Sequence, residues 1–291
     1  MARSSAKAAE PTITDDELAQ VERAKSSARK PVVFVHGLWL LPTSWDRWRT
    51  VFEKAGYVTL APGWPDDPET VEEAKEHPEV FAHKTIGEIA DHFEDVIGKL
   101  TQKPVVIGHS FGGLLTQIEA YSFHDVDGVV VLSYADLRPS LRTLAALTQA
   151  GVVCLGGGNP PGHAPFGQSD ADFQALMFHD ADPKVVAAVT AMRNPEPCGD
   201  DASLLTAIAT DVREVPSMTV PVLLLFGDHD AVFPPPALES QRRLFAGSRD
   251  VTAVTVPDTG HAVTVERSAG VTRDAVISWL CGHAFCASTA E

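Results

Sequence analysis

The chain has 291 residues, of which 44% are hydrophobic and 21% are charged, and this ordinary globular composition excludes a wholly disordered protein. Acidic residues outnumber basic ones by 39 to 23, and the net charge of −16 argues against binding to nucleic acid or to anionic lipid. No apolar stretch approaches the ~20 residues of a membrane-spanning helix, and residues 1–30 lack the apolar segment of a secretory signal. We therefore expect a cytoplasmic protein with neither a nucleic-acid nor a membrane partner. The sequence leaves its oligomeric state open.

The cysteines match neither a CxxC pair nor a zinc-binding framework in their spacing. They are Cys154, Cys198, Cys281 and Cys286. Because the cytoplasm keeps thiols reduced, we expect reduced structural thiols. A bond between Cys281 and Cys286 remains an open alternative.

Residues 1–30 are predicted to form an N-terminal extension that is partly helical. Thr14 and Glu17 have the spacing of a capping box, in which the hydroxyl and the carboxylate each accept a hydrogen bond from a free backbone N–H group. The predicted helix runs from this box to about Ala28, and Pro31 opens a different kind of sequence.

Short apolar runs, rich in Val, Ile and Leu, alternate with helical patterns from Pro31 onward. The runs are Val32–Val35, Tyr57–Leu60, Pro104–Gly108, Gly128–Leu132, Pro221–Phe226 and Val251–Val256. The helical segments are Ser44–Ala55, Thr85–Leu100, Phe111–Tyr121, Pro236–Phe245 and Glu266–Leu280. Runs without polar alternation are typical of parallel strands that are buried on both faces. The pattern predicts an α/β fold, doubly wound, with a mostly parallel sheet of about six strands and helices on both faces.

More than eighty residues separate the fourth apolar run from the fifth without a clear strand. A structureless loop of that length is implausible in a compact domain. Helices are predicted there at Leu141–Ala150, Ala171–Phe178, Pro183–Met192 and Ala202–Ala209. We expect a helical cap over residues 134–216, inserted into a core of residues 31–133 and 217–285.

A G-x-S-x-G motif, Gly108-His109-Ser110-Phe111-Gly112, lies between the third apolar run and a helical pattern. In this strand–turn–helix context the sharp turn exposes the serine hydroxyl, and the glycines let strand and helix approach closely. The helix N-terminus also favours developing negative charge. The motif predicts that Ser110 is a nucleophile.

A serine hydroxyl is a weak nucleophile until a base accepts its proton. Among the eleven histidines, His261 follows the last predicted strand, and Gly260 supplies a flexible turn before it. Sites in open α/β sheets lie beyond the carboxyl ends of the strands, which is where both Ser110 and His261 are placed. We expect His261 to be the base.

The imidazole in turn needs a carboxylate that fixes its tautomer. Asp228 and Asp230 both follow the run Pro221–Phe226. We favour Asp230 because it lies farther into the loop, whereas Asp228 can bond the backbone of its own turn. Asp136, which follows the Gly128–Leu132 run, is a less usual alternative.

The first apolar run is followed by His36, Leu38 and Trp39. The backbone amides of Leu38 and Phe111 are the predicted oxyanion hole, and His36 is predicted to be structural. Trp39 and Trp64 follow strand ends, and we expect them to bind substrate. Loop packing is an equally good interpretation of Trp64.

The chain order Ser110, Asp230, His261, with His36 upstream and an insertion before the acid, resembles the α/β-hydrolase superfamily over residues 31–282. The resemblance implies that family's fold, a Ser–His–Asp triad and the oxyanion roles at these positions. The family usually begins with an antiparallel strand pair, whereas residues 1–30 look helical. We therefore expect the sheet to be shortened at that edge.

The predicted activity is that of a serine hydrolase whose small-molecule substrate is a hydrophobic carboxylic ester, lactone or thioester. The same triad also fits hydrolysis of a C–C bond or cofactor-free perhydrolysis. A ligand-binding protein that keeps the fold is a further alternative. The sequence has no HExxH motif and no dinucleotide fingerprint after the first apolar run, so we expect no metal and no cofactor.

Overall fold

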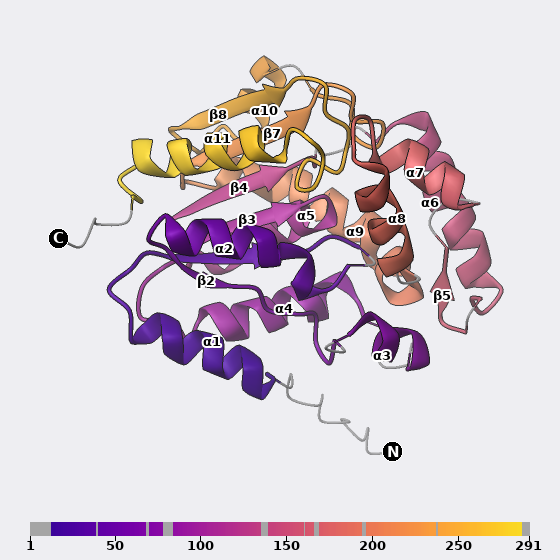
Figure 1. Cartoon of the computed structure of the whole chain (residues 1–291), viewed down its shortest axis with the longest axis horizontal. Coiled ribbons are helices and arrows are strands. Elements are labelled where there is room, and N and C mark those ends of the chain that lie inside the picture. The colour runs from indigo at the N-terminus through magenta and orange to yellow at the C-terminus, as the bar shows by residue number, and fades with distance from the viewer. Residues whose placement is uncertain are drawn as a thin grey trace, which may run out of the picture.

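The computed structural model describes residues 13–38, 40–67, 70–77, 84–134, 139–159, 161–165, 169–193, 196–236 and 238–286. Its centre is a six-stranded sheet with the order β2-β1-β3-β4-β7-β8, and every neighbouring pair is parallel (Figure 1). The strands are β1 (Pro31–Val35), β2 (Val58–Leu60), β3 (Val105–His109), β4 (Gly128–Leu132), β7 (Val222–Gly227) and β8 (Val251–Val256). The predicted α/β fold with a parallel sheet of about six strands is confirmed.

Helices cover both faces of the sheet because successive strand residues point to opposite sides. In β1, Val33 and Val35 join the core on one face, and Val32 and Phe34 join the core on the other. The first core also contains residues of α1 (Asp15–Lys25), α4 (Ile86–Ile97) and α5 (Phe111–Ile118). The second contains residues of α2 (Asp46–Lys54) and α11 (Ala269–Gly282), which lie in front of the sheet in Figure 1. Shorter helices are η1 (Pro42–Trp45), α3 (Val71–Glu76), η3 (Glu119–Phe123), η4 (Val215–Ser217) and α10 (Leu238–Leu244).

Helix α1 packs beside β2, at one edge of the sheet. The predicted capping box is present, and the helix ends at Lys25, three residues before the predicted end. The buried Gln20 side chain accepts a hydrogen bond from the backbone N–H of Ala61 (2.8 Å), and Glu17 accepts one from that of Gly63 (3.1 Å). No antiparallel strand joins this sheet within the described ranges, so the expected shortening at this edge is observed.

Four helices and a small sheet lie between β4 and β7, and we call residues 139–214 the cap segment. The helices are α6 (Leu141–Leu155), α7 (Asp170–Met177), α8 (Pro183–Met192) and α9 (Cys198–Glu214). Two short antiparallel strands, β5 (His163–Ala164) and β6 (Glu196–Pro197), pair with each other. The four predicted helices of this interval all occur, although α6 ends five residues later than predicted, and α9 begins four residues earlier and ends five residues later. Their division into a separate cap remains a proposal.

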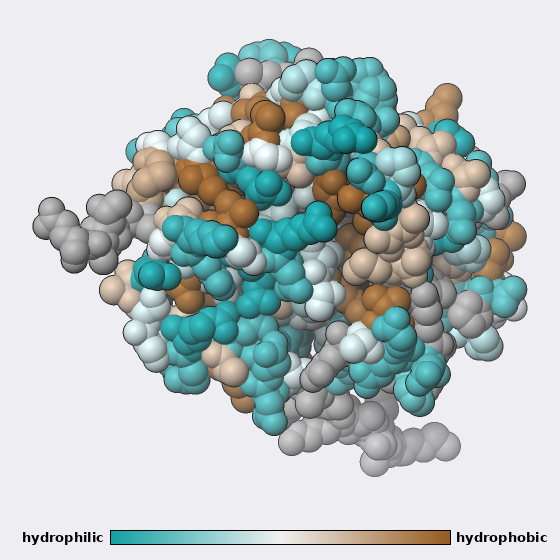
Figure 2. Space-filling view, in the orientation of Figure 1, coloured by the Kyte–Doolittle hydropathy of each residue, from teal (hydrophilic) through white to brown (hydrophobic). Residues whose placement is uncertain are grey.

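Among the described residues, most of the large apolar side chains that are well exposed lie on the cap segment. Leu141, Leu144, Val152 and Leu155 of α6 are 51–91% exposed. Figure 2 shows hydrophobic surface in several separate patches, on the cap side and over the core, of an otherwise mostly hydrophilic face. Among the described helices, none combines the length and the apolar character that crossing a membrane requires.

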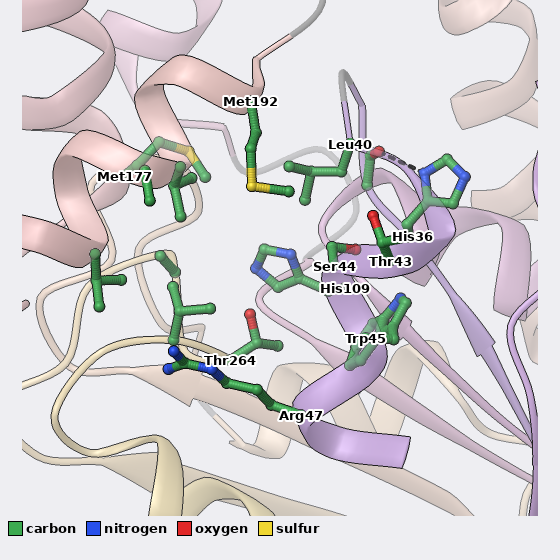
Figure 3. A pocket seen from close by; sticks show the side chains of 16 residues that line it. His36, Leu40, Thr43, Ser44, Trp45, Arg47, His109, Met177, Met192 and Thr264 are labelled. Atoms are coloured by element: carbon green, nitrogen blue, oxygen red, sulfur yellow. Dashed lines mark hydrogen bonds between the residues drawn. The ribbon is translucent and has the colours of Figure 1, made fainter. Parts of the chain in front are cut away.

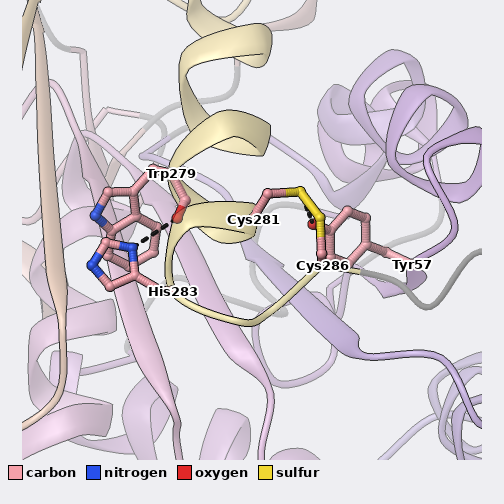
Figure 4. Close-up of a disulfide and its surroundings, with 5 residues drawn as sticks. All are labelled: Tyr57, Trp279, Cys281, His283 and Cys286. Carbon is pink, nitrogen blue, oxygen red and sulfur yellow. Dashed lines mark hydrogen bonds between the residues drawn. A yellow bond between two sulfur atoms is a disulfide. The ribbon is translucent and has the colours of Figure 1, made fainter.

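The four cysteines form two disulfides, so the prediction of reduced thiols is wrong. Cys154, at the end of α6, bonds Cys198, at the start of α9, across 44 positions of sequence. Cys281 bonds Cys286 at the end of α11, beside Tyr57 (Figure 4). Sequence spacing could not reveal the first pair, because only the packing of α6 against α9 brings its two cysteines together. Since disulfides persist in oxidising compartments, the thiol argument no longer supports a cytoplasmic location.

Candidate active site

Ser110 occupies a strained turn between β3 and α5. Its φ of 55° and ψ of −123° are uncommon for a residue with a side chain, and its N–H donates to the carbonyl of Leu132 (2.8 Å). A Cβ on Gly108 would lie 2.0 Å from the carbonyl oxygen of Gly112, and a Cβ on Gly112 would lie 2.3 Å from that of Val35. Only glycine fits at these two positions, so the close approach that the motif predicts is present.

The structure brings the three predicted side chains into one hydrogen-bonded chain. Ser110 Oγ lies 2.8 Å from Nε2 of His261, and Nδ1 of His261 lies 3.0 and 3.1 Å from the two carboxylate oxygens of Asp230. A carboxylate can only accept, so Nδ1–H donates to Asp230 and Nε2 accepts the serine proton. His261 and Asp230 are only 1% and 4% exposed. This orientation leaves His261 able to remove a proton from Ser110.

The two candidate acids have different partners. Oδ1 of Asp230 accepts hydrogen bonds from the backbone N–H groups of Val232 and Phe233 (both 2.9 Å), which hold the carboxylate toward His261. The exposed Asp228 instead accepts from Nδ1 of His229 (2.7 Å), and this bond lowers the pKa of Asp228. The structure therefore places Asp230, and not Asp228, at the imidazole. Asp136 lies outside the described residues.

His109, the residue before the serine, supports the loop of His261. Its Nε2–H donates to the carbonyl oxygen of His261 (2.8 Å), because a carbonyl can only accept. Burial, and then the nearby His261, lower the pKa of His109 to about 3, so the ring stays neutral. Sequence reasoning missed this positioning role, although the histidine inside the G-x-S-x-G motif was visible.

The loop after β1 packs directly against the turn of Ser110. A Cβ on Gly37 would lie 3.1 Å from the carbonyl oxygen of His109 and 3.5 Å from Cβ of Ser110. This proximity brings the neighbouring Leu38, together with Phe111, to the cavity that Ser110 lines. Both predicted oxyanion residues are thus beside the serine.

His36 and Trp64 form a structural support behind this loop. Nδ1 of His36 lies 3.0 Å from the carbonyl oxygen of Gly37, and Nε2 lies 3.3 Å from Asp67. Trp64 is buried, stacks on His36 with ring centroids 5.3 Å apart, and lines neither of the cavities beside the serine. The structure therefore shows loop packing for Trp64 instead of the predicted substrate contact. Trp39 lies outside the described residues.

A mainly apolar cavity, which we call the serine cavity, contains both Ser110 and His261. Core residues form one wall and the cap segment forms the other. The core contributes Leu38, Phe111, Leu114, Tyr134, Val232 and Phe233, and the cap segment contributes Pro139, Thr143, Leu147, Met177, Leu204 and Ile208. Apolar walls of this kind exclude water and bind hydrocarbon groups.

A second cavity, which we call the outer cavity, shares Met177 with the serine cavity and lies next to His109. In Figure 3, Met192 enters it from above, Arg47 lies along its lower edge, and Ser44 lies across from the cap residues. Val185, Ala188 and Val189 of α8 complete its apolar side. The cavity therefore has an apolar cap wall and a core wall with hydroxyl and guanidinium groups.

Residues 32–275 match the α/β hydrolase family. The chain belongs to this family. It is similar in structure to the monoacylglycerol lipase of Paleococcus ferrophilus, with a TM-score of 0.65 and 22% identity over 87% of this chain and 94% of that chain. The thermophilic esterase of Thermogutta terrifontis gives a TM-score of 0.64 and 21% identity over 87% and 90% of the two chains. The esterase of Exiguobacterium antarcticum gives a TM-score of 0.62 and 16% identity over 87% of this chain and 92% of that chain. At these identities the structures show a shared fold, and family membership confirms the predicted enzyme class, a hydrolase.

Proposed function

We propose that this α/β hydrolase cleaves carboxylic esters, lactones or thioesters of small hydrophobic molecules through an acyl-enzyme on Ser110. The hydrogen-bonded chain from Ser110 through His261 to Asp230 carries the proposal. His261 accepts the serine proton as Ser110 attacks the carbonyl carbon, and Asp230 stabilises the imidazolium. His261 then donates the proton to the leaving alcohol or thiol. In the second half, His261 activates a water molecule that releases the acid.

The oxyanion of the tetrahedral intermediate is proposed to accept hydrogen bonds from the amides of Leu38 and Phe111. Phe111 is the first residue of α5, so its N–H lies at the positive end of the helix dipole. The side chains of both residues line the serine cavity and add apolar surface. Fixed amide donors stabilise the developing charge without reorganising during the reaction.

The two cavities suggest how the substrate is divided. We infer that the acyl group occupies the serine cavity, whose walls are almost wholly apolar. The alcohol side then leaves through the outer cavity, where Thr43, Ser44 and Thr264 offer hydroxyls opposite the apolar cap wall. Two of the structural neighbours are named as esterases and one as a monoacylglycerol lipase, which supports an ester over a C–C bond.

A replacement of Ser110 by alanine tests the proposal. We expect Ser110→Ala to abolish labelling by a fluorophosphonate probe and to lower kcat/KM for p-nitrophenyl esters and lactones about 10⁴-fold or more. Ser44→Ala, in the outer cavity, is the matched control and keeps the label. Unchanged labelling of Ser110→Ala would remove the assignment. Many turnovers per site with any of these substrates would exclude the alternative of a binding protein without turnover.

A variant of Leu204, which lines the serine cavity from α9, tests whether the acyl group of the substrate binds in that cavity. We expect Leu204→Trp to lower kcat/KM more than about tenfold for esters with long acyl chains, because the added ring fills the cavity, and to leave acetate esters nearly unchanged. Leu144→Trp, at an exposed position of α6, is the matched control. An equal loss for short and long acyl chains would contradict the assignment.

The cytoplasmic location stays a prediction. The two disulfides favour an oxidising compartment instead. Titration of free thiols in protein purified without reductant measures whether the four cysteines are disulfide-bonded or reduced.

A further inference from the structure

Three side chains that the hydrolase chemistry does not use meet where the cap segment joins the core. His179 follows α7, His229 follows β7 and Asp258 follows β8, and all three are exposed. Their potential ligand atoms, one imidazole nitrogen from each histidine and one carboxylate oxygen, all lie within 4.8 Å of one another. Sequence spacing does not reveal this cluster, because its three residues come from distant segments of the chain.

The backbone around these residues is held in place by a buried carboxylate. Glu266 accepts hydrogen bonds from the N–H groups of His179 (2.8 Å), Asp180 (3.2 Å) and Gly260 (3.0 Å). The N–H of His229 donates to the carbonyl of Thr259 (2.9 Å), which ties the loop after β7 to the loop after β8. The three segments therefore keep their spacing without help from a ligand.

The environment of His229 is that of a metal ligand. Its Nδ1–H donates to Oδ1 of Asp228 (2.7 Å), and the same oxygen accepts the N–H of Thr259 (3.1 Å). This bond fixes the tautomer and leaves the lone pair of Nε2 available. Metal-bound histidines almost always donate their second ring nitrogen in this way to a carboxylate, carbonyl or water.

The two imidazoles are stacked, with ring centroids 3.7 Å apart and planes inclined by 11°. Two nitrogens that bind one ion must point toward it from different directions, so the ring of His179 has to turn on binding while His229 keeps its hydrogen bond to Asp228. Exposed side chains make such a rotation at low cost. Nothing in the packing of the core has to change.

We propose that His179, His229 and Asp258 bind a divalent transition-metal ion, of which Zn²⁺ fits the donor set best. Two imidazoles and a carboxylate, completed by water, are a common tetrahedral zinc set, whereas Mg²⁺ and Ca²⁺ prefer oxygen ligands. The bound ion joins the end of α7 to the two loops that carry Asp230 and His261. It acts as a clamp between the cap segment and the core, and this role does not depend on the proposed hydrolase activity.

Isothermal titration of the full chain with Zn²⁺, in a buffer free of chelators and thiols, tests this site. We expect the titration to show about one Zn²⁺ bound per chain. The melting temperature should rise when Zn²⁺ is added and fall back to its starting value when EDTA removes the ion. Mg²⁺ should give neither effect. His179→Gln and His229→Gln should each weaken binding at least about tenfold, and so should Asp228→Asn, which replaces the carboxylate that supports His229 by a neutral amide.

The control is His283→Gln. His283 also pairs with an aspartate, Asp250 (2.8 Å), but lies away from the cluster, so Zn²⁺ binding should be unchanged. Circular dichroism in EDTA checks that each variant is folded. Absence of stoichiometric binding at micromolar Zn²⁺, or equal weakening by His283→Gln, would overturn the proposal. Fluorophosphonate labelling of the same variants in EDTA reports separately on the hydrolase function.

Discussion

The edge of the sheet that carries Ser110 and the cap segment above it are built in different ways. At the sheet edge, backbones touch so closely that Gly108 and Gly112 admit no side chain, and the adjoining residues of β3 and β4 are buried throughout. In the cap segment, α8 has no fully buried residue, and Leu141 and Leu155 of α6 are 87% and 91% exposed. The first region is packed closely throughout, whereas the second is packed unevenly. Phe173, Leu176 and Met177 of α7 are buried in the core, while α6 and α8 are largely exposed and a disulfide ties α6 to α9.

The difference in packing suggests that the core and the cap segment contribute to different steps, proton transfer and substrate selection. Proton transfer needs groups that are held within a few tenths of an ångström, and the core supplies them. Substrate choice needs walls that differ between relatives or move with the ligand, and the cap segment supplies the outer wall of both cavities. Changes in the core should therefore affect the rate for all substrates, and changes in the cap segment should affect selectivity and local stability.

The largest effect is expected from Asp230→Asn in the core. The amide can offer its NH₂ group to His261, which favours the wrong tautomer, so kcat should fall about 10⁴-fold for every ester tested. Thermal unfolding should show that the protein remains folded. Asp228→Asn, assayed in EDTA, is the matched control, since Asp228 contacts His229 and not His261. A comparable loss in that variant would mean that the wrong carboxylate has been assigned.

The three candidate triad residues could be chosen from the sequence because each lies shortly after a strand: Ser110 directly after β3, Asp230 three residues after β7 and His261 five residues after β8. Ser110 has a motif, and His261 and Asp230 each follow an apolar run that parallel topology brings to one edge. The short strands β5 and β6 were not predicted, whereas the six strands of the main sheet were predicted to within about one residue. Local sequence determines such features.

Features that depend on contacts between distant segments could not be predicted. The bond of Cys154 to Cys198 needs the packing of α6 against α9. The support of His261 by His109 needs the register of two separate loops. Trp64 follows a strand end as predicted but turns toward His36, a choice that only side-chain packing decides.

A smaller effect is expected in the cap segment, from replacing Cys154 and Cys198 by serine. Loop closure over 44 positions stabilises the folded state by up to about 4 kcal/mol, against about 2 kcal/mol for the five positions between Cys281 and Cys286. Denaturant unfolding measures the two losses. In the Cys154 and Cys198 variants, the rate of backbone hydrogen exchange should increase more in α6 and α9 than in β3 and β4. Equally faster exchange in all four elements would show that cap and core unfold as one unit, against the comparison above.

The smallest effect is expected from Glu119→Gln, in the core behind Ser110. Both carboxylate oxygens of Glu119 are buried and have no hydrogen-bond partner within the described part of the chain. Burial, and then the charges of Glu94 and Asp91, raise the pKa of Glu119 well above its ordinary value.

The folded state therefore keeps a proton on Glu119 that the unfolded chain releases at lower pH, so the stability that this proton provides is lost as the pH rises through the folded-state pKa. Glutamine removes the titration. The melting temperature of Glu119→Gln should thus exceed that of the wild type by a margin that grows from about pH 5 to about pH 8. Differential scanning fluorimetry measures this margin, with Glu239→Gln on the exposed side of α10 as the control. A margin independent of pH would mean that Glu119 is already ionised in the folded core.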